Sequence, residues 1–291
     1  MNKKTTEINR KNERGSVDQL CEQGSPPGSR QAAAIRAMTA IWRLLDHGPC
    51  PADWNLAVDE ALLASHANDQ GPPTLRFYQW STPTLSLGAG QKWPLHSLDV
   101  TCRDLGVVVV RRPTGGRAVL HGGDLTYSLV AGARDGFPVS TTLVYRRLSQ
   151  GLKAGLRRLG IMAESGAAVR LGTAFACFAL ATPADLTWQG RKFLGSAQVW
   201  RGPSFLQHGS ILLESQAEIW PRLWSNCQSQ CVKATPLTAM AEILQVQVSL
   251  ATLKTALLQG FQETLGVMFQ AGELSRPESL WAESRRIALR L

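Results

Sequence analysis

The stretch RRPTGGRAVLHGG, residues 111–123, concentrates residue types that can hold an anionic or acyl group. Glycine adopts positive φ at no steric cost, so its two glycine pairs can bring backbone N–H groups close to a ligand and form concave anion sites. Spacing alone also fits two hairpin turns with surface arginines, and the histidine could equally stabilise its own turn. The candidate substrate-binding residues here are Arg112, Thr114, Gly115, Gly116, Arg117, His121 and Gly122.

A second candidate site combines RKFLGSAQ with the later QHGS. Lys192 follows a Gln-Gly turn at the start of an expected strand, and consecutive small residues on a strand let a ligand or a neighbour approach closely. A strand packed against a helix needs the same small residues, and a lone lysine at this place is commonly a solvated edge residue. The candidate residues beside Lys192 are Gly195, Ser196, Ala197, Gln198, His208 and Gly209.

Cys177, in the segment GTAFACFAL, is the candidate nucleophile. An apolar thiol is usually inert core, because a cysteine with a pKa near ~8.5 is only slightly ionised at neutral pH. A lysine ammonium about 4 Å away contributes roughly 4 kcal/mol at an effective dielectric constant of about 20. At ~1.36 kcal/mol per unit this lowers the thiol pKa by about 3 units, so a nearby cation would make Cys177 reactive.

Composition favours a globular chain without a membrane span. The 291 residues are 44% hydrophobic, and no window is apolar enough to cross a bilayer. The N-terminus is too polar and too acidic for a signal peptide, so we expect a cytoplasmic protein. Six cysteines occur without a CxxC pair or a histidine cluster, which indicates neither a disulfide framework nor a metal site.

The net charge of +9 suits an acidic partner or an anionic substrate. The basic residues are spread along the chain rather than grouped into a lysine and arginine block with interleaved aromatics. Nucleic acid is therefore the least favoured partner, and salt-sensitive retention on DNA would revive it.

The pattern along the chain predicts a disordered N-terminal tail over residues 1–36 and a single domain over residues 37–291. IWRLLD begins the fold as a strand, and Asp53 caps a helix through WNLAVDEALLASH with Asp59 and Glu60 off its apolar face. These two carboxylates could orient Arg76, although surface salt bridges are the more common role.

Further strands are predicted at TLRFYQW, TLSLG, VVVVRR, ADLTW, RKFLGSAQVW and SFLQHGSILLE, the last three as an antiparallel meander. Helices are predicted from Leu98 to Leu105, over residues 140–160, in LATLKTALLQGFQETLG and in PESLWAESRR. The apolar stripe of leucines on the 140–160 helix runs from Leu143 to Leu159. This order predicts an α+β fold of mixed, largely antiparallel sheets with flanking helices, packed on one side.

Five segments occur in an order that resembles the biotin/lipoate protein ligase superfamily, in its lipoate ligase A and octanoyltransferase branch. They are NLAVDEALL, LRFYQWSTPTLSLGAGQ, VVRRPTGGRAVLHGGDLTYSL, GRKFLGSAQ and LQHGSILL, and the resemblance covers about residues 40–270. The resemblance implies that the RRPTGGRAVLHGG turn lines the pocket for the acyl head and that the GSAQ and HGS strands wall a tunnel for an eight-carbon chain. It also implies that Arg76 contributes to substrate binding and that Lys192 is the catalytic lysine.

Within that superfamily the segment ACFALATPADLTWQGRKFLGSAQ resembles one class of octanoyltransferase, with Cys177 as nucleophile and Lys192 as general acid and base. Gly-Ser after His208 departs from the other octanoyltransferase class, whose cysteine follows the lysine. Only 78 residues follow the last meander strand, whereas ligases commonly carry an accessory domain. The resemblance implies transfer from octanoyl-acyl carrier protein to apo lipoyl domains of 2-oxoacid dehydrogenases or the glycine cleavage H protein, without a cofactor.

Three alternatives remain open from the sequence. An ATP-dependent lipoate ligase, with ATP and Mg as cofactors, would place Lys192 on the carboxylate and phosphate and would not need Cys177. An octanoyl amidotransferase would take the acyl group from another lipoyl-bearing protein. A non-catalytic acyl-group binder would bind the ligand without turnover.

Overall fold

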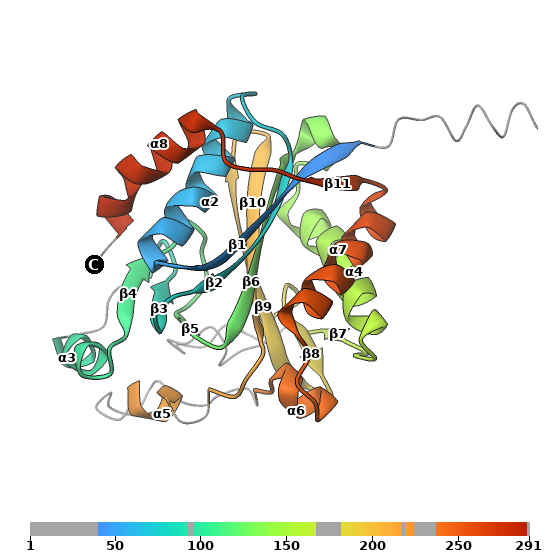
Figure 1. The fold of residues 1–291 in the computed structure, drawn as a ribbon. Helices are drawn as coiled ribbons and strands as arrows, with labels where there is room; N and C mark the ends of the chain where they lie inside the picture. The colour runs from blue at the N-terminus through green and yellow to red at the C-terminus, as the bar shows by residue number, and fades with distance from the viewer. Residues whose placement is uncertain (1–39, 92–95, 167–181, 217–218, 224–236, 290–291) are drawn as a thin grey trace, which may run out of the picture. The chain divides into compact units, whose positions relative to one another are not determined.

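The computed structural model describes residues 40–91, 96–166, 182–216, 219–223 and 237–289, and it forms two sheets with helices around them (Figure 1). The larger sheet has the strand order β11-β1-β2-β6-β10-β9-β8-β7, and the smaller has the order β4-β3-β5. The strands of the larger sheet are β1 (Ile41–Cys50), β2 (Thr74–Trp80), β6 (Asp124–Gly132), β7 (Glu164–Ser165), β8 (Leu186–Trp188), β9 (Arg191–Arg201), β10 (Ser204–Leu212) and β11 (Met268–Ala271). The smaller sheet consists of β3 (Thr84–Leu87), β4 (Val108–Arg111) and β5 (Val119–His121).

The helices are α2 (Ala52–Ala67), α3 (His96–Asp104), α4 (Thr141–Arg158), α5 (Ile219–Leu223), α6 (Met240–Leu244), α7 (Leu250–Leu265) and α8 (Arg276–Arg285). Short 3₁₀ turns occur at Ala133–Asp135 and Arg286–Leu289. In the described part of the chain, no helix combines the length and the hydrophobicity that crossing a bilayer requires.

The larger sheet is mixed and largely antiparallel, as the sequence predicts. β1 pairs in parallel with both β2 and β11, whereas β2, β6, β10, β9, β8 and β7 follow one another in antiparallel pairs. The meander of β8, β9 and β10 is confirmed, and its first turn has positive φ at Gln189 and Gly190. The strand β11 is absent from the prediction because its four residues are too short to show a period of two.

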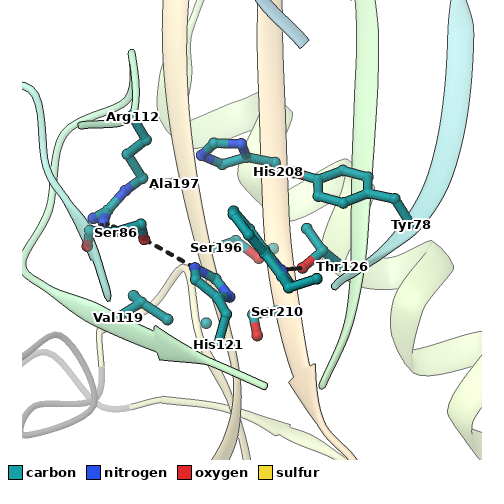
Figure 2. Close-up of a pocket in the computed structure, with 13 residues that line it drawn as sticks. Tyr78, Ser86, Arg112, Val119, His121, Thr126, Ser196, Ala197, His208 and Ser210 are labelled. Atoms are coloured by element: carbon teal, nitrogen blue, oxygen red, sulfur yellow. Dashed lines mark hydrogen bonds between the residues drawn. The ribbon is translucent and has the colours of Figure 1, made fainter. Parts of the chain in front are cut away.

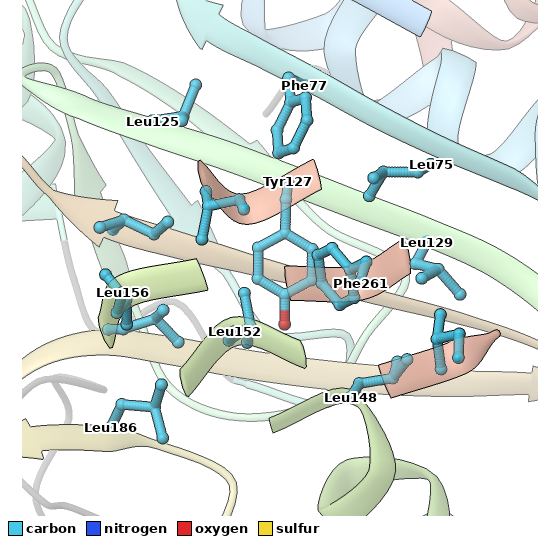
Figure 3. Packing of buried hydrophobic residues seen from close by; sticks show 14 of the residues in the cluster. Leu75, Phe77, Leu125, Tyr127, Leu129, Leu148, Leu152, Leu156, Leu186 and Phe261 are labelled. Carbon is cyan, nitrogen blue, oxygen red and sulfur yellow. The ribbon is translucent and has the colours of Figure 1, made fainter. Parts of the chain in front are cut away.

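The helices cover both faces of the larger sheet, and the predicted one-sided packing is therefore wrong. Alternate strand residues point to opposite faces, so Leu75 and Phe77 pack toward α4 and α7, while Tyr78 packs toward α2. Figure 3 shows the first of these cores, with Tyr127 and Phe261 among the leucines of α4. Both sides of β2 and β6 are buried, so hydrophobicity alone does not distinguish the helix-covered face.

Three details of the predicted helices need correction. Pro51 precedes the first residue of α2 without a side-chain cap, and the expected cap Asp53 lies inside the first turn. Asp59, expected off the apolar face, is completely buried. In α4, Leu148 and its neighbours on the stripe are buried as predicted, but Leu143 in the first turn is 45% exposed.

Helices α4 and α7 cross at glycines that let their backbones touch. A Cβ atom added at Gly260 would lie 2.3 Å from the carbonyl oxygen of Gly151 and 2.3 Å from the nitrogen of Gly155. Both neighbours are main-chain atoms, so the helices would have to move apart. This crossing holds α4 against the face of the sheet that carries Tyr127.

We expect Gly260→Ala to lower the free energy of unfolding by about 1–3 kcal/mol, because overpacking outweighs the gain in helix propensity of about 1 kcal/mol. Urea denaturation followed by circular dichroism measures the change. Gly48→Ala is the matched control, since nothing lies within 4 Å of a Cβ atom at that position. An equal or higher midpoint for Gly260→Ala than for the wild type would contradict the close crossing.

Candidate active site

A buried carboxylate on α2 organises the face of the sheet on which the site lies. Asp59 Oδ1 accepts hydrogen bonds from Arg76 Nη1 at 2.8 Å and from the Ser128 hydroxyl at 2.7 Å. Its Oδ2 atom accepts from the Tyr78 hydroxyl at 3.0 Å and from His208 Nδ1 at 3.1 Å. One side chain of α2 thereby connects strands β2, β6 and β10.

The charges of this cluster follow from burial and contact. Burial alone would raise the Asp59 pKa, but the hydrogen bond from His208 and the charge of Arg76 outweigh it and hold that pKa below its usual value. Burial lowers the pKa of His208 despite the neighbouring carboxylate. His208 is therefore neutral near pH 7, and the hydrogen-bond network assigns its proton to Nδ1, leaving Nε2 as an acceptor.

His208 and Arg112 hold the Pro-Thr-Gly-Gly turn in place. The Thr114 hydroxyl donates to His208 Nε2 at 2.7 Å and accepts from Arg112 Nε at 3.2 Å. The Arg112 guanidinium also donates to the carbonyl oxygens of Ser86, Gly115 and Arg117 at 2.7–2.8 Å. Arg112 is thus buried scaffolding for the turn rather than a surface arginine.

Neither glycine turn is a hairpin turn. The strands β4 and β5 flank the first turn but pair with β3 rather than with each other. The second turn joins β5 of the smaller sheet to β6 of the larger sheet, so it carries the chain between sheets. Gly116 and Gly122 have φ values of +91° and +125°, which glycine tolerates, whereas Gly115, also expected at positive φ, is not in that region.

His121 is fixed on three sides at the second turn. Its Nδ1 atom donates to Asp124 at 2.9 Å, its Nε2 atom accepts from the Ser86 hydroxyl at 2.9 Å, and its ring stacks on Trp80 with 4.0 Å between centroids. Burial alone would raise the Asp124 pKa, but contacts with His121 and Ser210 hold it below its usual value. The imidazole therefore forms part of a rigid wall.

Residues of both sheets line a cavity that is partly open to solvent (Figure 2). Aromatic, hydroxyl and small side chains surround the space, and the small residues of β9 and β10 form the wall where a larger side chain would fill it. The lining residues are Tyr78, Trp80, Ser86, Arg112, Val119, His121, Thr126, Gly195, Ser196, Ala197, His208, Gly209 and Ser210.

A wider groove shares part of its border with this cavity, since Ser196 and Ala197 line both. Arg117 of the first glycine turn and Asp185, just before β8, both line the groove. The remaining lining residues are Gly115, Gly116, Tyr145, Thr182, Ala184 and Gln198. A ligand whose tail occupies the cavity would therefore have its head between a glycine turn, a cation and a carboxylate.

Lys192 lies next to this groove and is completely buried. Its ammonium forms an ion pair with Asp185 Oδ2 at 2.9 Å, and both side chains are withdrawn from solvent. A Cβ atom at Gly195 would lie 3.2 Å from Lys192 Cε and 3.4 Å from Nζ, so the lysine extends over that glycine. Lys192 is therefore not the solvated edge residue of the alternative interpretation.

A search of family models matches residues 51–262 to the lipoyl protein ligase A/B catalytic domain. The chain belongs to this family. A protein named Octanoyltransferase LipM from Carboxydothermus hydrogenoformans is 41% identical over 245 residues, which cover 81% of this chain and 91% of that protein. A protein of the same name from Geobacillus kaustophilus is 36% identical over 260 residues, which cover 84% and 93%.

A crystal structure of lipoate-protein ligase A bound with ATP has a similar fold, with a TM-score of 0.68 and 25% identity. The alignment covers 86% of this chain and 95% of that chain. The predicted α+β fold and the membership in the lipoyl ligase and octanoyltransferase branch are confirmed. The share of the chain matched by the family model includes both glycine turns and the meander.

The lipoyl ligase fold brings most of the predicted substrate-binding residues together, although their binding roles stay predictions. Arg112, His121, Gly195, Ser196, Ala197, His208 and Gly209 line the cavity, and Gly115, Gly116, Arg117 and Gln198 line the groove. Thr114 holds the turn through His208. Gly122 lines neither space and donates its N–H to Asp124.

Two other predicted site residues are Arg76 and Cys177. Arg76, expected to bind substrate, is fully buried and does not line the cavity; its guanidinium donates to His47, Asn55 and Asp59. Cys177 lies outside the described residues, so its role as nucleophile stays a prediction. The nearest described positions to it along the chain are Gly166 and Thr182.

Sequence reasoning missed several residues of the site. Tyr78 and Trp80 alternate with buried residues of β2, and this spacing places them on the same face as Arg76, which could have revealed them. Asp185 precedes a three-residue strand and has no distinguishing pattern of its own. Ser86 and Asp124 lie in different sheets, and only the tertiary fold brings both to His121.

Proposed function

We propose that this protein is an octanoyltransferase that carries the acyl group on Cys177 between donor and acceptor. The enzyme class rests on the relatives: proteins named octanoyltransferase are 34–41% identical to this chain over most of both lengths. The octanoyltransferase function predicted from the sequence is thus confirmed at the level of the enzyme class. The ATP-dependent ligase is less favoured, because its support is a structural neighbour at 25% identity.

The shared border of cavity and groove is the observation that carries the mechanism. The small residues Gly195, Ala197 and Gly209 line the cavity, as a thin aliphatic chain requires. Ser196 and Ala197 line both the cavity and the groove. We assign the cavity to the octanoyl chain and the groove to the thioester carbonyl and the group that carries it.

The proposed transfer has two halves. In the first, the Cys177 thiolate attacks the carbonyl carbon of an octanoyl thioester; a C–S bond forms to Cys177, the bond to the carrier sulfur breaks, and that sulfur leaves and takes up a proton. In the second, a lysine amine of the acceptor attacks the acyl-cysteine, forms the amide, and releases the Cys177 thiol. The thioester donor is already activated, so the transfer itself requires no nucleotide.

Lys192 is the described cation best suited to this chemistry. It is buried, it lies against Gly195 of the cavity wall, and its partner Asp185 lines the groove. A buried ammonium stabilises a nearby thiolate more strongly than a solvated one does. We propose that Lys192 stabilises the Cys177 thiolate and exchanges protons with the leaving and attacking groups in both halves.

The carbonyl oxygen of the acyl group becomes negatively charged in each half. The backbone of the Gly115 to Arg117 turn borders the groove, and Arg112 and Thr114 hold that turn rigidly. Preorganised N–H groups are the usual means of stabilising such an oxyanion. We propose that this turn supplies them.

Lipoyl domains are the acceptor class for this family, and we propose octanoyl-acyl carrier protein as the donor. The resemblance implies that the lipoyl domains are small and acidic, and the net charge of +9 favours an encounter with them. Lipoyl domains of 2-oxoacid dehydrogenases and the glycine cleavage H protein remain proposals as the individual acceptors.

Intact-mass spectrometry of the protein mixed with octanoyl-acyl carrier protein, without ATP, tests the mechanism. We expect an octanoyl adduct that hydroxylamine removes, that peptide mapping locates on Cys177, and that moves to an apo lipoyl domain when one is added. Cys177→Ser should abolish the thioester adduct. Cys50→Ser is the matched control and should retain it, because Cys50 lies at the end of β1 and lines neither space.

Other outcomes would select an alternative. Modification of the lipoyl domain that needs free octanoate and ATP, and that Cys177→Ser leaves intact, would identify a ligase. An adduct that forms only from an octanoylated lipoyl protein would identify an amidotransferase. Binding of octanoate without transfer under either condition would indicate a non-catalytic acyl binder.

A further inference from the structure

The carboxylate of Asp185 is the meeting point of several donors beside the groove. Its Oδ2 atom accepts from Lys192 Nζ at 2.9 Å and from the backbone nitrogen and hydroxyl of Thr182 at 2.7 and 2.9 Å. The Ser196 nitrogen approaches Oδ1 at 3.4 Å. Asp185 is 2% exposed, and these contacts leave it a single position.

The same contacts fix where the Lys192 ammonium lies. The lysine begins β9, crosses over Gly195, and ends at Asp185, so its Nζ atom is confined between a wall residue of the cavity and a lining residue of the groove. A lysine side chain has a flexible four-carbon stem, so an ammonium without a fixed partner would sample many positions. The Asp185 carboxylate is therefore a group that holds the cation in this position.

Stability is a weak explanation for this pair. Burying a carboxylate and an ammonium together commonly gives no net gain over apolar residues of the same size, because both lose their hydration. Nor does the pair join distant layers of the fold, since Asp185 precedes β8 and Lys192 begins the neighbouring strand. Its distinctive feature is its location between Gly195, which lines the cavity, and the groove that Asp185 lines.

We propose that Asp185 is a positioning residue that holds the Lys192 ammonium at the groove, where the proposed mechanism requires a cation for the reacting thiol and carbonyl. The inference rests on the proposed function, because the thiol is that of Cys177. Asp185 acts through Lys192 and does not itself touch the acyl group. Two consequences follow. The charge of Asp185 affects the ionisation of the Cys177 thiol, and the length of its side chain affects the rate at which Cys177 is octanoylated.

Two substitutions separate charge from reach. Asp185→Asn keeps the shape and removes the charge, so the ammonium loses its anchor; Asp185→Glu keeps the charge and displaces it by one methylene. We expect Asp185→Asn to slow octanoylation of Cys177 by octanoyl-acyl carrier protein by about 10-fold or more, the size typical of losing the partner that orients an active-site group. Asp185→Glu should restore part of that loss.

The pH dependence distinguishes positioning from a structural role. The rate at which iodoacetamide alkylates Cys177, followed by peptide mass spectrometry, reports the thiolate fraction at each pH. For Asp185→Asn we expect the midpoint of this profile to move away from the wild-type value, because the substitution removes one charge of the ion pair beside the groove. Asp185→Glu should keep the wild-type midpoint. Asp46→Asn, a surface carboxylate paired with Lys254, is the matched control and should change neither rate nor midpoint.

A third comparison tests whether Asp185 acts through the lysine. In a Lys192→Met background, adding Asp185→Asn should lower the alkylation rate no further. An unchanged pH midpoint in Asp185→Asn would overturn the proposal. So would a loss of alkylation rate on Asp185→Asn that is equal with and without Lys192. A wild-type protein that forms no thioester on Cys177 would instead refute the proposed function, and thermal unfolding of each variant identifies loss of folding.

Discussion

Replacing Lys192 with methionine is expected to slow the transfer of octanoate to Cys177 by about 10²- to 10⁴-fold, the usual contribution of a group that moves protons at a reacting centre. Methionine keeps the length and the apolar stem of the side chain but removes the ammonium beside the groove. Single-turnover mass spectrometry with octanoyl-acyl carrier protein measures the acylation step directly. We expect the acylation rate of Lys192→Arg to lie between the rates of the wild type and of Lys192→Met, because arginine keeps a cation of different shape.

The matched control for this change is Lys254→Met. Lys254 lies on α7, is partly exposed, and pairs with the exposed Asp46 at the protein surface, so its loss should leave the acylation rate within a factor of two to three of wild type. An acylation rate for Lys192→Met equal to that of Lys254→Met would contradict the catalytic role. Circular dichroism of both variants shows whether the fold is retained.

Replacing Arg76 with methionine is expected to lower the free energy of unfolding by about 3–5 kcal/mol, because it leaves the carboxylate of Asp59 buried and without its cation. Both side chains of this pair are 0% exposed. The Asp59 pKa is held below its usual value in part by Arg76, so the variant should also unfold at higher pH than the wild type on acidification. Urea denaturation at pH 7 and an acid titration measure the two effects.

Arg158→Met provides the comparison for this second change. Arg158 pairs with Glu263, and both side chains are about half exposed, so its loss should cost less than about 1 kcal/mol. A similar small cost for Arg76→Met would mean that Asp59 finds other compensation, and the account of the Asp59 cluster would be wrong. The residual activity of Arg76→Met, measured where the variant is folded, shows how far the cluster orients the Pro-Thr-Gly-Gly turn.

The fold could be predicted to the extent that local pattern determines it. The meander strands alternate or carry a clear Gln-Gly turn, and the 140–160 helix has a leucine stripe that ends at Gly160, so each was located correctly. The faces of the sheet could not be predicted, because β2 and β6 are buried on both sides and give no sign of which helices cover them. For this reason the sequence pattern predicts helices on one side of the sheet only, whereas the structure has them on both faces.

The site was predicted unevenly for a related reason. Glycine turns and small residues on strands have a local signature, and the structure places them at one cavity and groove. Ion pairs have no such signature. Asp59 reaches Arg76 from 17 positions away and His208 from 149 positions away, and only the assembled sheet brings the three together. Lys192 was recognised through resemblance, whereas its partner Asp185 was not.

The contacts between Asp59, His208 and Thr114 also bear on how variants of this enzyme should be interpreted. Asp59 on α2 lies 55 residues before Thr114 of the Pro-Thr-Gly-Gly turn (114 − 59), yet two hydrogen bonds through His208 connect them. A genetic screen for altered acyl-chain preference would therefore recover changes on α2 that never contact the acyl group. Such changes would alter the turn through His208, and a list of cavity-lining positions would not include them.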